Sequence, residues 1–305
     1  MITMGEHTSA EGQRAAGPRR PRRTARFRHR YRGVGERPNV LGGLGALAWL
    51  VVVALPLYAL LVATVQRGEN YVPEGPLALP SDPTPGNYVA AVDKGLLGFV
   101  GNTALVTVAV VALVVVLAAT TSYATVRSRT RITDAAFRVF LLGLAIPAQA
   151  VVIPVYVIIV RLELYDTLAA IVLPTAAFAL PVCVLILVGS MRDISEELYE
   201  AMALDGAGPV RTFLGLVVPM SRSGLGTVAV YSALQAWNGF LFPLILTQSA
   251  DRRVITMGLY EFQGEYRVDV PGLLTAVVLS TVPLFIVYLV ARRSLADGLM
   301  GVGGR

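Results

Sequence analysis

The sequence predicts an all-α, polytopic membrane protein with about six transmembrane helices. Apolar residues make up 55% of its 305 residues and charged residues only 15%, whereas soluble domains usually carry about 25% charge. The charges gather in clusters, and between them lie six charge-free runs, each long enough for the roughly 20-residue helix that crosses a bilayer. A buried helix of a soluble protein could account for one or two such runs, but not for six.

These runs are expected to be helices, because a backbone segment in lipid has to satisfy its own hydrogen bonds. They are Leu41–Val65, Gly95–Val126, Val139–Val160, Thr167–Met191, Ser223–Ala250 and Val270–Ala291. Together they define a transmembrane domain over residues 41–291, between an Arg-rich tail (1–40) that we expect to be disordered and a C-terminal tail (292–305). Several runs contain proline, which removes a backbone donor, so we expect kinked helices.

Basic residues predict the orientation of the chain in the membrane. With the N-terminus in the cytoplasm, 20 of the 26 Lys and Arg residues fall on cytoplasmic segments and 6 on outer segments, while the acidic residues divide 10 and 10. Basic residues, and not net charge, set topology. We therefore expect a multi-pass protein of the bacterial plasma membrane with both termini in the cytoplasm, and an N-terminal tail that lies against anionic lipid headgroups.

The residue types inside the six runs exclude most chemistry. Both histidines, His7 and His29, lie in the N-terminal tail. The runs therefore lack the histidine that an intramembrane serine protease or a metalloprotease would need. Ion-coupled secondary transporters usually hold ionisable residues within the membrane, and these runs hold none. Such a transporter stays an alternative, but the absence favours a permease driven from outside the chain and an uncharged substrate. We expect no cofactor and no nucleic-acid partner.

The segment between the fourth and fifth runs, residues 192–219, is predicted to form a helix–turn–helix. Asp193 and Glu196 resemble a capping box that opens the first helix. Gly206 is then expected to end that helix in the left-handed conformation, and Pro209 to begin the second helix. The second helix, Val210–Val218, is expected to end at Pro219. It places three apolar side chains on one side: Phe213, Leu214 and Val217.

An apolar helix face with an acidic rim outside the membrane runs predicts a docking surface for a partner protein. Five acidic residues and three arginines lie between Arg192 and Arg222. The alternative is an amphipathic helix pair that lies on the membrane, but such helices usually carry Lys and Arg on their polar face. The acidic residues therefore favour docking.

The same segment resembles a known family. Glu200-Ala201-Met202-x-x-x-Gly206, then nine residues, then Leu216-x-Val218-Pro219 is similar to the EAA loop of bacterial ABC importer permeases. The sequence Asp205-Gly206-Ala207…Phe213 resembles the corresponding segment of the maltose-type sugar permeases in particular. Four shorter motifs agree with it: Gly101-Asn102-Thr103 opening the second helix, Ser122-Tyr123-Ala124 closing it, Ala236-Trp237-Asn238 in the fifth, and Gly298-Leu299 near the C-terminus. The resemblance covers residues 41–301. Met202, Leu216 and Val218 are conservative departures from the family pattern.

The resemblance implies a permease subunit that works with a second homologous permease, an ATP-binding-cassette ATPase dimer and an extracytoplasmic sugar-binding protein. The residues that would couple it to the ATPase are Glu200, Ala201, Met202, Asp205, Gly206, Phe213 and Pro219. This chain is not expected to be an enzyme. A phosphate-binding Walker A loop requires a lysine in a Gly-rich context, and Lys94, the one lysine of the sequence, lacks that context.

The expected substrate is a sugar or an oligosaccharide, or otherwise another uncharged solute. Sugars are commonly held by aromatic faces and amide groups, and the fifth run offers Tyr231, Gln235, Trp237 and Asn238. Three of them (231, 235 and 238) follow i, i+4, i+7 spacing on one helix face. The alternative for the same side chains is polar contact between helices, together with a tryptophan that anchors the membrane interface.

Overall fold

The computed structural model describes residues 40–128, 130–262 and 268–300, and within these ranges every regular element is a helix. The predicted N-terminal tail up to residue 39 lies outside the described residues, as does 301–305. The chain divides into two units, one ending at Val51 and one beginning at Val52. The described part of the first unit is the first half of α1 (Val40–Ala63). The candidate site residues all lie in the second unit.

Among the described residues, four helices are long and apolar enough to cross a membrane alone: α1, α4 (Leu96–Ser128), α7 (Leu168–Arg192) and the first part of α14 (Val270–Met300). Two more spans result if each of two bent helix pairs counts as one. The prediction of about six transmembrane helices is confirmed. Residues 292–300, which belong to the predicted C-terminal tail, are helical and continue α14.

The first bent pair corresponds to the predicted run Val139–Val160. α5 (Arg131–Leu142), extended by the short η1 (Gly143–Ala145), meets η2 (Ala148–Val151) and α6 (Val152–Arg161) at an angle of 97°. The break falls at Ile146, which adopts φ −87° and ψ 111°. A residue before proline is disfavoured in the helical conformation, and Pro147 follows Ile146.

The second bent pair consists of Pro209–Met220 and α11 (Arg222–Trp237), at an angle of 78°. Within the predicted run Ser223–Ala250 the helix is also interrupted. α11 ends at Asn238, and the short α12 (Leu241–Leu246) follows. Gly239 lies in the break, where a Cβ atom would stand 3.2 Å from the carbonyl oxygen of Gln235. The backbone therefore approaches itself closely at this point, and a glycine accommodates the approach.

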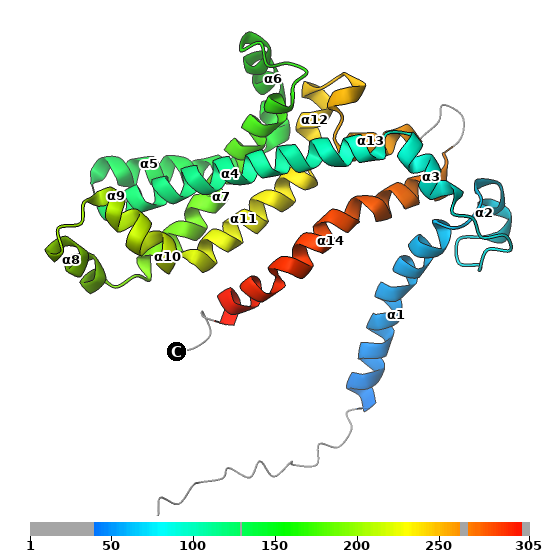
Figure 1. Cartoon of the computed structure of the whole chain (residues 1–305), viewed down its shortest axis with the longest axis horizontal. Coiled ribbons are helices and arrows are strands. Elements are labelled where there is room, and N and C mark those ends of the chain that lie inside the picture. Colours follow the sequence, from blue (N-terminus) through cyan, green and yellow to red (C-terminus); the bar gives the residue numbers. More distant parts are fainter. Residues whose placement is uncertain (1–39, 129, 263–267, 301–305) are drawn as a thin grey trace, which may run out of the picture. The chain divides into compact units, whose positions relative to one another are not determined.

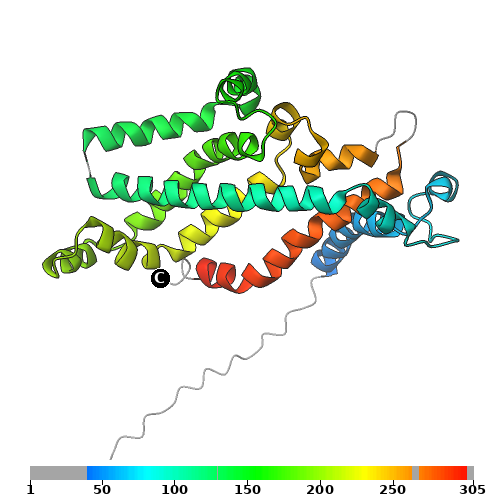
Figure 2. The same ribbon diagram turned by 45° about the horizontal axis from the view of Figure 1, so that its top comes forward.

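The core of the second unit is formed by α4, α7 and α11, which run side by side in Figures 1 and 2. One face of α4 is buried against the other two helices, because small apolar side chains recur on it at every fourth residue: Val106, Val110, Val114 and Ala118. α11 lies close to α7 at Gly224, where a Cβ atom would lie 2.7 Å from Ser190 Oγ. Another face of α4 exposes Leu105 and Val108, as expected for contact with lipid.

The segment between α1 and α4 contains two short helices, α2 (Gly68–Glu74) and α3 (Gly86–Asp93). The Asn87 side chain on α3 donates hydrogen bonds to the carbonyls of Thr64 and Gln66, both at 2.9 Å. These two bonds hold the end of α1 to α3. The remaining short elements are η4 Ala250–Arg252, α13 Ile255–Gly258 and η5 Leu259–Phe262.

Candidate functional site

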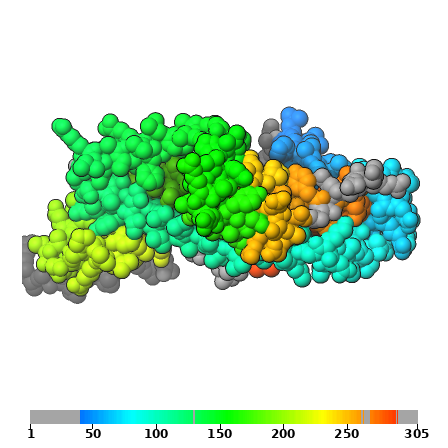
Figure 3. Space-filling view, turned by 90° about the horizontal axis from the view of Figure 1, so that it is seen from above, coloured from blue at the N-terminus to red at the C-terminus, as the bar shows by residue number. Residues whose placement is uncertain are grey.

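The segment between α7 and α11 forms a helical hairpin at one end of the core helices (Figures 1 and 3). Its first helix is α8 (Glu196–Leu204). Its second helix consists of α9 (Pro209–Thr212), a π-helical turn (Phe213–Val217) and α10 (Val218–Met220). The predicted helix–turn–helix is therefore present. The second helix of the hairpin, Pro209–Met220, meets α11 at an angle of 78°.

The beginning of α8 differs from the predicted capping box. The N-cap is Ser195, whose side chain makes no capping hydrogen bond, and Asp193 instead caps the C-terminus of α7. Asp193 has φ −75° and ψ −11°, a helical conformation, whereas an N-cap residue is typically extended. Glu196 pairs with Arg127 of α4, with Arg127 Nη1 2.8 Å from Glu196 Oε1. Glu196 and Glu197 still favour the positive end of the α8 dipole.

The turn between the two helices agrees with the prediction. Gly206 has φ +71°, and its N–H bonds to the carbonyl of Ala203. Gly208 is the N-cap of α9 and Pro209 occupies the first position of that helix. The left-handed conformation of Gly206 is one that L-residues adopt only at a cost, which explains the glycine.

The second helix exposes a different set of side chains from the predicted one. Val217 is fully buried in the core and Phe213 packs against it, while Leu214 is 61% exposed. The three therefore do not share one outward face. An apolar residue looks the same in sequence whether it meets its own core or a partner.

Pro219 also does not end the helix, which continues to Met220. In an α-helix the proline ring would collide with the carbonyl of Gly215, four residues earlier. The preceding turn is π-helical, with the N–H of Val218 bonded to the carbonyl of Phe213. This wider turn moves the carbonyl away and admits the proline.

Most of the predicted coupling residues lie on the exposed part of this hairpin. We define the docking surface as Glu200, Ala201, Leu204, Asp205, Val210 and Leu214, all of them exposed. Leu204 is 89% exposed and Val210 71%. Met202 lies inward, its Cε 3.9 Å from where a Cβ of Gly215 would stand. The docking surface thus combines apolar side chains with two carboxylates.

Two residues of α4 hold the hairpin: Tyr123, which the sequence offered only as part of a family motif, and Arg127, which no sequence motif indicated. The Tyr123 hydroxyl donates to the carbonyl of Pro209 at 3.2 Å, and its ring lies 5.2 Å from that of Phe213. Arg127, one turn further along, places its guanidinium carbon 4.2 Å from the ring centroid of Tyr199. Tyr199 is only 4% exposed, and this burial raises its pKa. The sequence signal that could have indicated this contact is a Tyr and an Arg one turn apart at the end of one span, together with an acidic loop elsewhere in the chain.

The candidate substrate-path residues are only partly brought together. Tyr231 packs against the core, and Gln235 is exposed one turn along the same face of α11. Trp237 is 7% exposed and therefore closed to a solute in this chain. The Asn238 side chain donates to the carbonyl of Leu234 at 2.9 Å and thereby caps α11. Trp237 and Asn238 are thus used by the fold itself.

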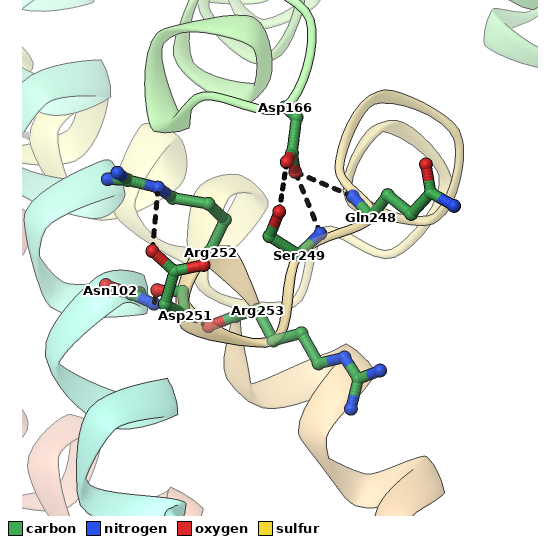
Figure 4. Close-up of polar contacts among 7 residues, drawn as sticks. All are labelled: Asn102, Asp166, Gln248, Ser249, Asp251, Arg252 and Arg253. Carbon is green, nitrogen blue, oxygen red and sulfur yellow. Dashed lines mark hydrogen bonds and ion pairs between the residues drawn. The ribbon is translucent and has the colours of Figure 1, made fainter.

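At the other end of α4, polar side chains fix the segment that follows α12 (Figure 4). Asn102 donates to the carbonyls of Asp251 and Arg253, both at 2.8 Å. Thr103 Oγ1 accepts from the N–H of Ile255, also at 2.8 Å. Asn102 and Thr103 belong to one of the quoted motifs, but α4 begins at Leu96, so the motif lies inside the helix and does not open it.

Asp166, in the loop before α7, holds the same segment from another side (Figure 4). Its carboxylate accepts from the N–H groups of Gln248 and Ser249, at 2.8 Å and 2.9 Å, and from the Ser249 hydroxyl. These bonds, that of the hydroxyl first, lower the pKa of the Asp166 carboxyl. The segment after α12 is therefore tied to α4 and to the loop before α7 and is not a free loop.

Comparison with known proteins relates this arrangement to transport. A family model described as "binding-protein-dependent transport system inner membrane component" matches residues 115–299. The diacetylchitobiose uptake system permease protein NgcG of Streptomyces coelicolor is 30% identical over 256 residues, covering 83% of this chain and 84% of that protein. The sulfoquinovosyl glycerol transport system permease protein SmoH of Agrobacterium fabrum is 28% identical, covering 73% and 79%.

A solved structure shares the fold. A chain of a bacterial ABC transporter involved in the import of the acidic polysaccharide alginate superimposes with a TM-score of 0.72 at 18% identity. The match covers 83% of this chain and 95% of that one. The overall fold of this chain is therefore one already known from a solved structure.

Proposed function

Because this chain belongs to the family of binding-protein-dependent transport system inner membrane components, we propose that it is the permease subunit of an ATP-binding-cassette importer for a sugar or oligosaccharide. The family consists of transport subunits and not of enzymes. The carbohydrate substrate is supported by the names of the relatives. One chain with the same fold comes from a transporter involved in the import of an acidic polysaccharide, so the fold by itself does not indicate a neutral substrate. The match to this family leaves the ion-coupled alternative without support.

The observation that carries the proposal is the docking surface on the α8–α9 hairpin. Leu204, Val210 and Leu214 expose most of their apolar area beside the carboxylates of Glu200 and Asp205. Fully burying one such side chain contributes about 1.5–3 kcal/mol, so a partner that covers all three gains substantially. We propose that this partner is the ATPase subunit. Met202 and Phe213, which are partly buried, would pack the hairpin from within, while Gly206 and Pro219 would set the course of its backbone.

On the substrate side, we retain two of the four side chains as candidates for contact with the sugar. Tyr231 and Gln235 lie one turn apart on α11 and offer an aromatic face and an amide. Trp237 and Asn238 support the end of the helix, and their contribution to the path would be indirect.

The functional test is reconstitution of the whole importer in liposomes. We expect the purified chain alone to hydrolyse no ATP, because it lacks a phosphate-binding loop. Co-expressed with a second permease and the ATPase, it should form a complex whose hydrolysis rises when loaded sugar-binding protein is added. ATP turnover by this chain alone, or a complex that ignores the binding protein, would contradict the proposal.

We also propose that the hairpin faces the cytoplasm and that both termini lie on the same side. The 20 to 6 division of basic residues supports this orientation. Reporter fusions after Val65 and Val160 should then report the outside, and fusions after Val126 and Met191 the inside. An inverted result at any two of these positions would reject the orientation.

A further inference from the structure

α8 is attached to the rest of the chain at few points. Of its residues, all of which the structure describes, Tyr199 alone is buried. A cavity of about 260 Å³ lies between the start of α8 and the ends of α4, α5 and α7, lined among others by Thr125, Asp134 and Ile194. The N-terminal turn of α8 is therefore not packed broadly against the helices behind it.

The backbone on either side of α8 is not helical. Before it, Ser195 is extended, with φ −62° and ψ 142°. After it, the chain turns through Gly206, which is left-handed, and Gly208, which is extended. Because neither connection is helical, no continuous helix transmits a displacement of α8 to α7 or to α11.

The α4 clamp supplies the missing attachment, and we define it as Tyr123 and Arg127. They lie four residues apart and therefore on one face of the helix. Arg127 contacts α8 through Glu196 and Tyr199, and Tyr123 contacts the second helix through Pro209 and Phe213. Both halves of the hairpin thus rest on a single turn of α4.

α4 differs from the other long helices in being free of proline. It is one helix from Leu96 to Ser128, whereas α1, α7 and α14 each contain proline and α11 ends at the break before α12. At about 1.5 Å per residue it spans roughly 50 Å. At its far end Asn102 and Thr103 hold the segment from Asp251 to Ile255.

We propose that α4 links the two sides of the importer. The α4 clamp positions the ATPase-docking hairpin, and Asn102 positions the segment after α12. A movement at either end then displaces the other through one unbroken helix. Tyr123, Arg127 and Asn102 are positioning residues in this mechanism, which rests on the proposed docking of the ATPase to the hairpin.

The test at the hairpin end is a charge exchange in the reconstituted complex. Arg127→Glu places two carboxylates together, and we expect it to lower binding-protein-stimulated ATP hydrolysis and uptake by about tenfold, while the ATPase still co-purifies. Adding Glu196→Arg should restore most of the stimulation. Arg138→Glu, at an exposed arginine of α5, is the matched control and should have little effect.

The test at the far end compares two asparagines in the same complex. Asn102→Ala and Asn87→Ala each remove two hydrogen bonds to backbone carbonyls, but only Asn102 lies on α4. Asn102→Ala should lower the stimulation by the binding protein several-fold more than Asn87→Ala does. Three results would overturn the inference. The first is full stimulation by the binding protein in Arg127→Glu, and the second is lost stimulation that Glu196→Arg does not restore. The third is an equal loss of stimulation in Asn102→Ala and Asn87→Ala.

The result also separates this inference from the proposed function. If the ATPase fails to co-purify with the unmodified chain, the proposed docking itself is wrong. If the ATPase co-purifies and stimulation is normal but the α4 variants have no effect, only the role of α4 is wrong.

Discussion

Replacing Gly206 with threonine should nearly abolish sugar uptake, whereas the same replacement at Gly208 should leave it close to normal. Gly206 has φ +71°, where a β-branched residue is strained, by about 1–2 kcal/mol or more. That strain lowers the ratio of native to non-native turn roughly 5–30-fold. No atom would crowd a side chain at either glycine. The expected loss therefore comes from the backbone, which redirects the second helix of the hairpin.

Gly208 makes the comparison informative because it lies two residues away in the same turn. It is extended and forms the N-cap of α9, a position that threonine suits. Gly206→Asn adds a graded test, since asparagine tolerates the left-handed conformation better than threonine does. Uptake of labelled sugar at matched expression should decrease in the order Gly208→Thr, Gly206→Asn, Gly206→Thr. Equal uptake in all three variants would show that the turn geometry does not matter for transport.

The number and approximate position of the spans could be predicted from the sequence because bilayer thickness fixes the length of a charge-free run. Kinks at prolines could be expected, but which prolines break a helix could not. Pro147 interrupts its run, yet Pro174 and Pro181 lie inside the continuous α7. The two prolines of α7 are buried in the core, where neighbouring helices hold the segment, whereas Pro147 is exposed. This difference depends on packing partners from elsewhere in the chain.

The same distinction divides the candidate site. The conformation of Gly206 and the helix start at Pro209 were predictable because they depend on neighbouring residues alone. The burial of Phe213 and Val217 was not, because it depends on α4 and α7. The contacts of Tyr123 and Arg127 with the hairpin join residues 86 and 69 positions apart. A sequence read alone contains no distance information at that range.

The most direct test of the account is photo-cross-linking from the docking surface in the complete importer. A photoreactive residue at Leu204, which is 89% exposed on α8, should form an adduct with the ATPase subunit on irradiation. The matched control is Val72, an apolar residue of α2 that is 84% exposed and should face the opposite side of the membrane. We expect an ATPase adduct from Leu204 and none from Val72. An intact complex that gives no ATPase adduct from Leu204, or gives one equally from Val72, would contradict the assignment of the hairpin as the site that couples ATP hydrolysis to transport.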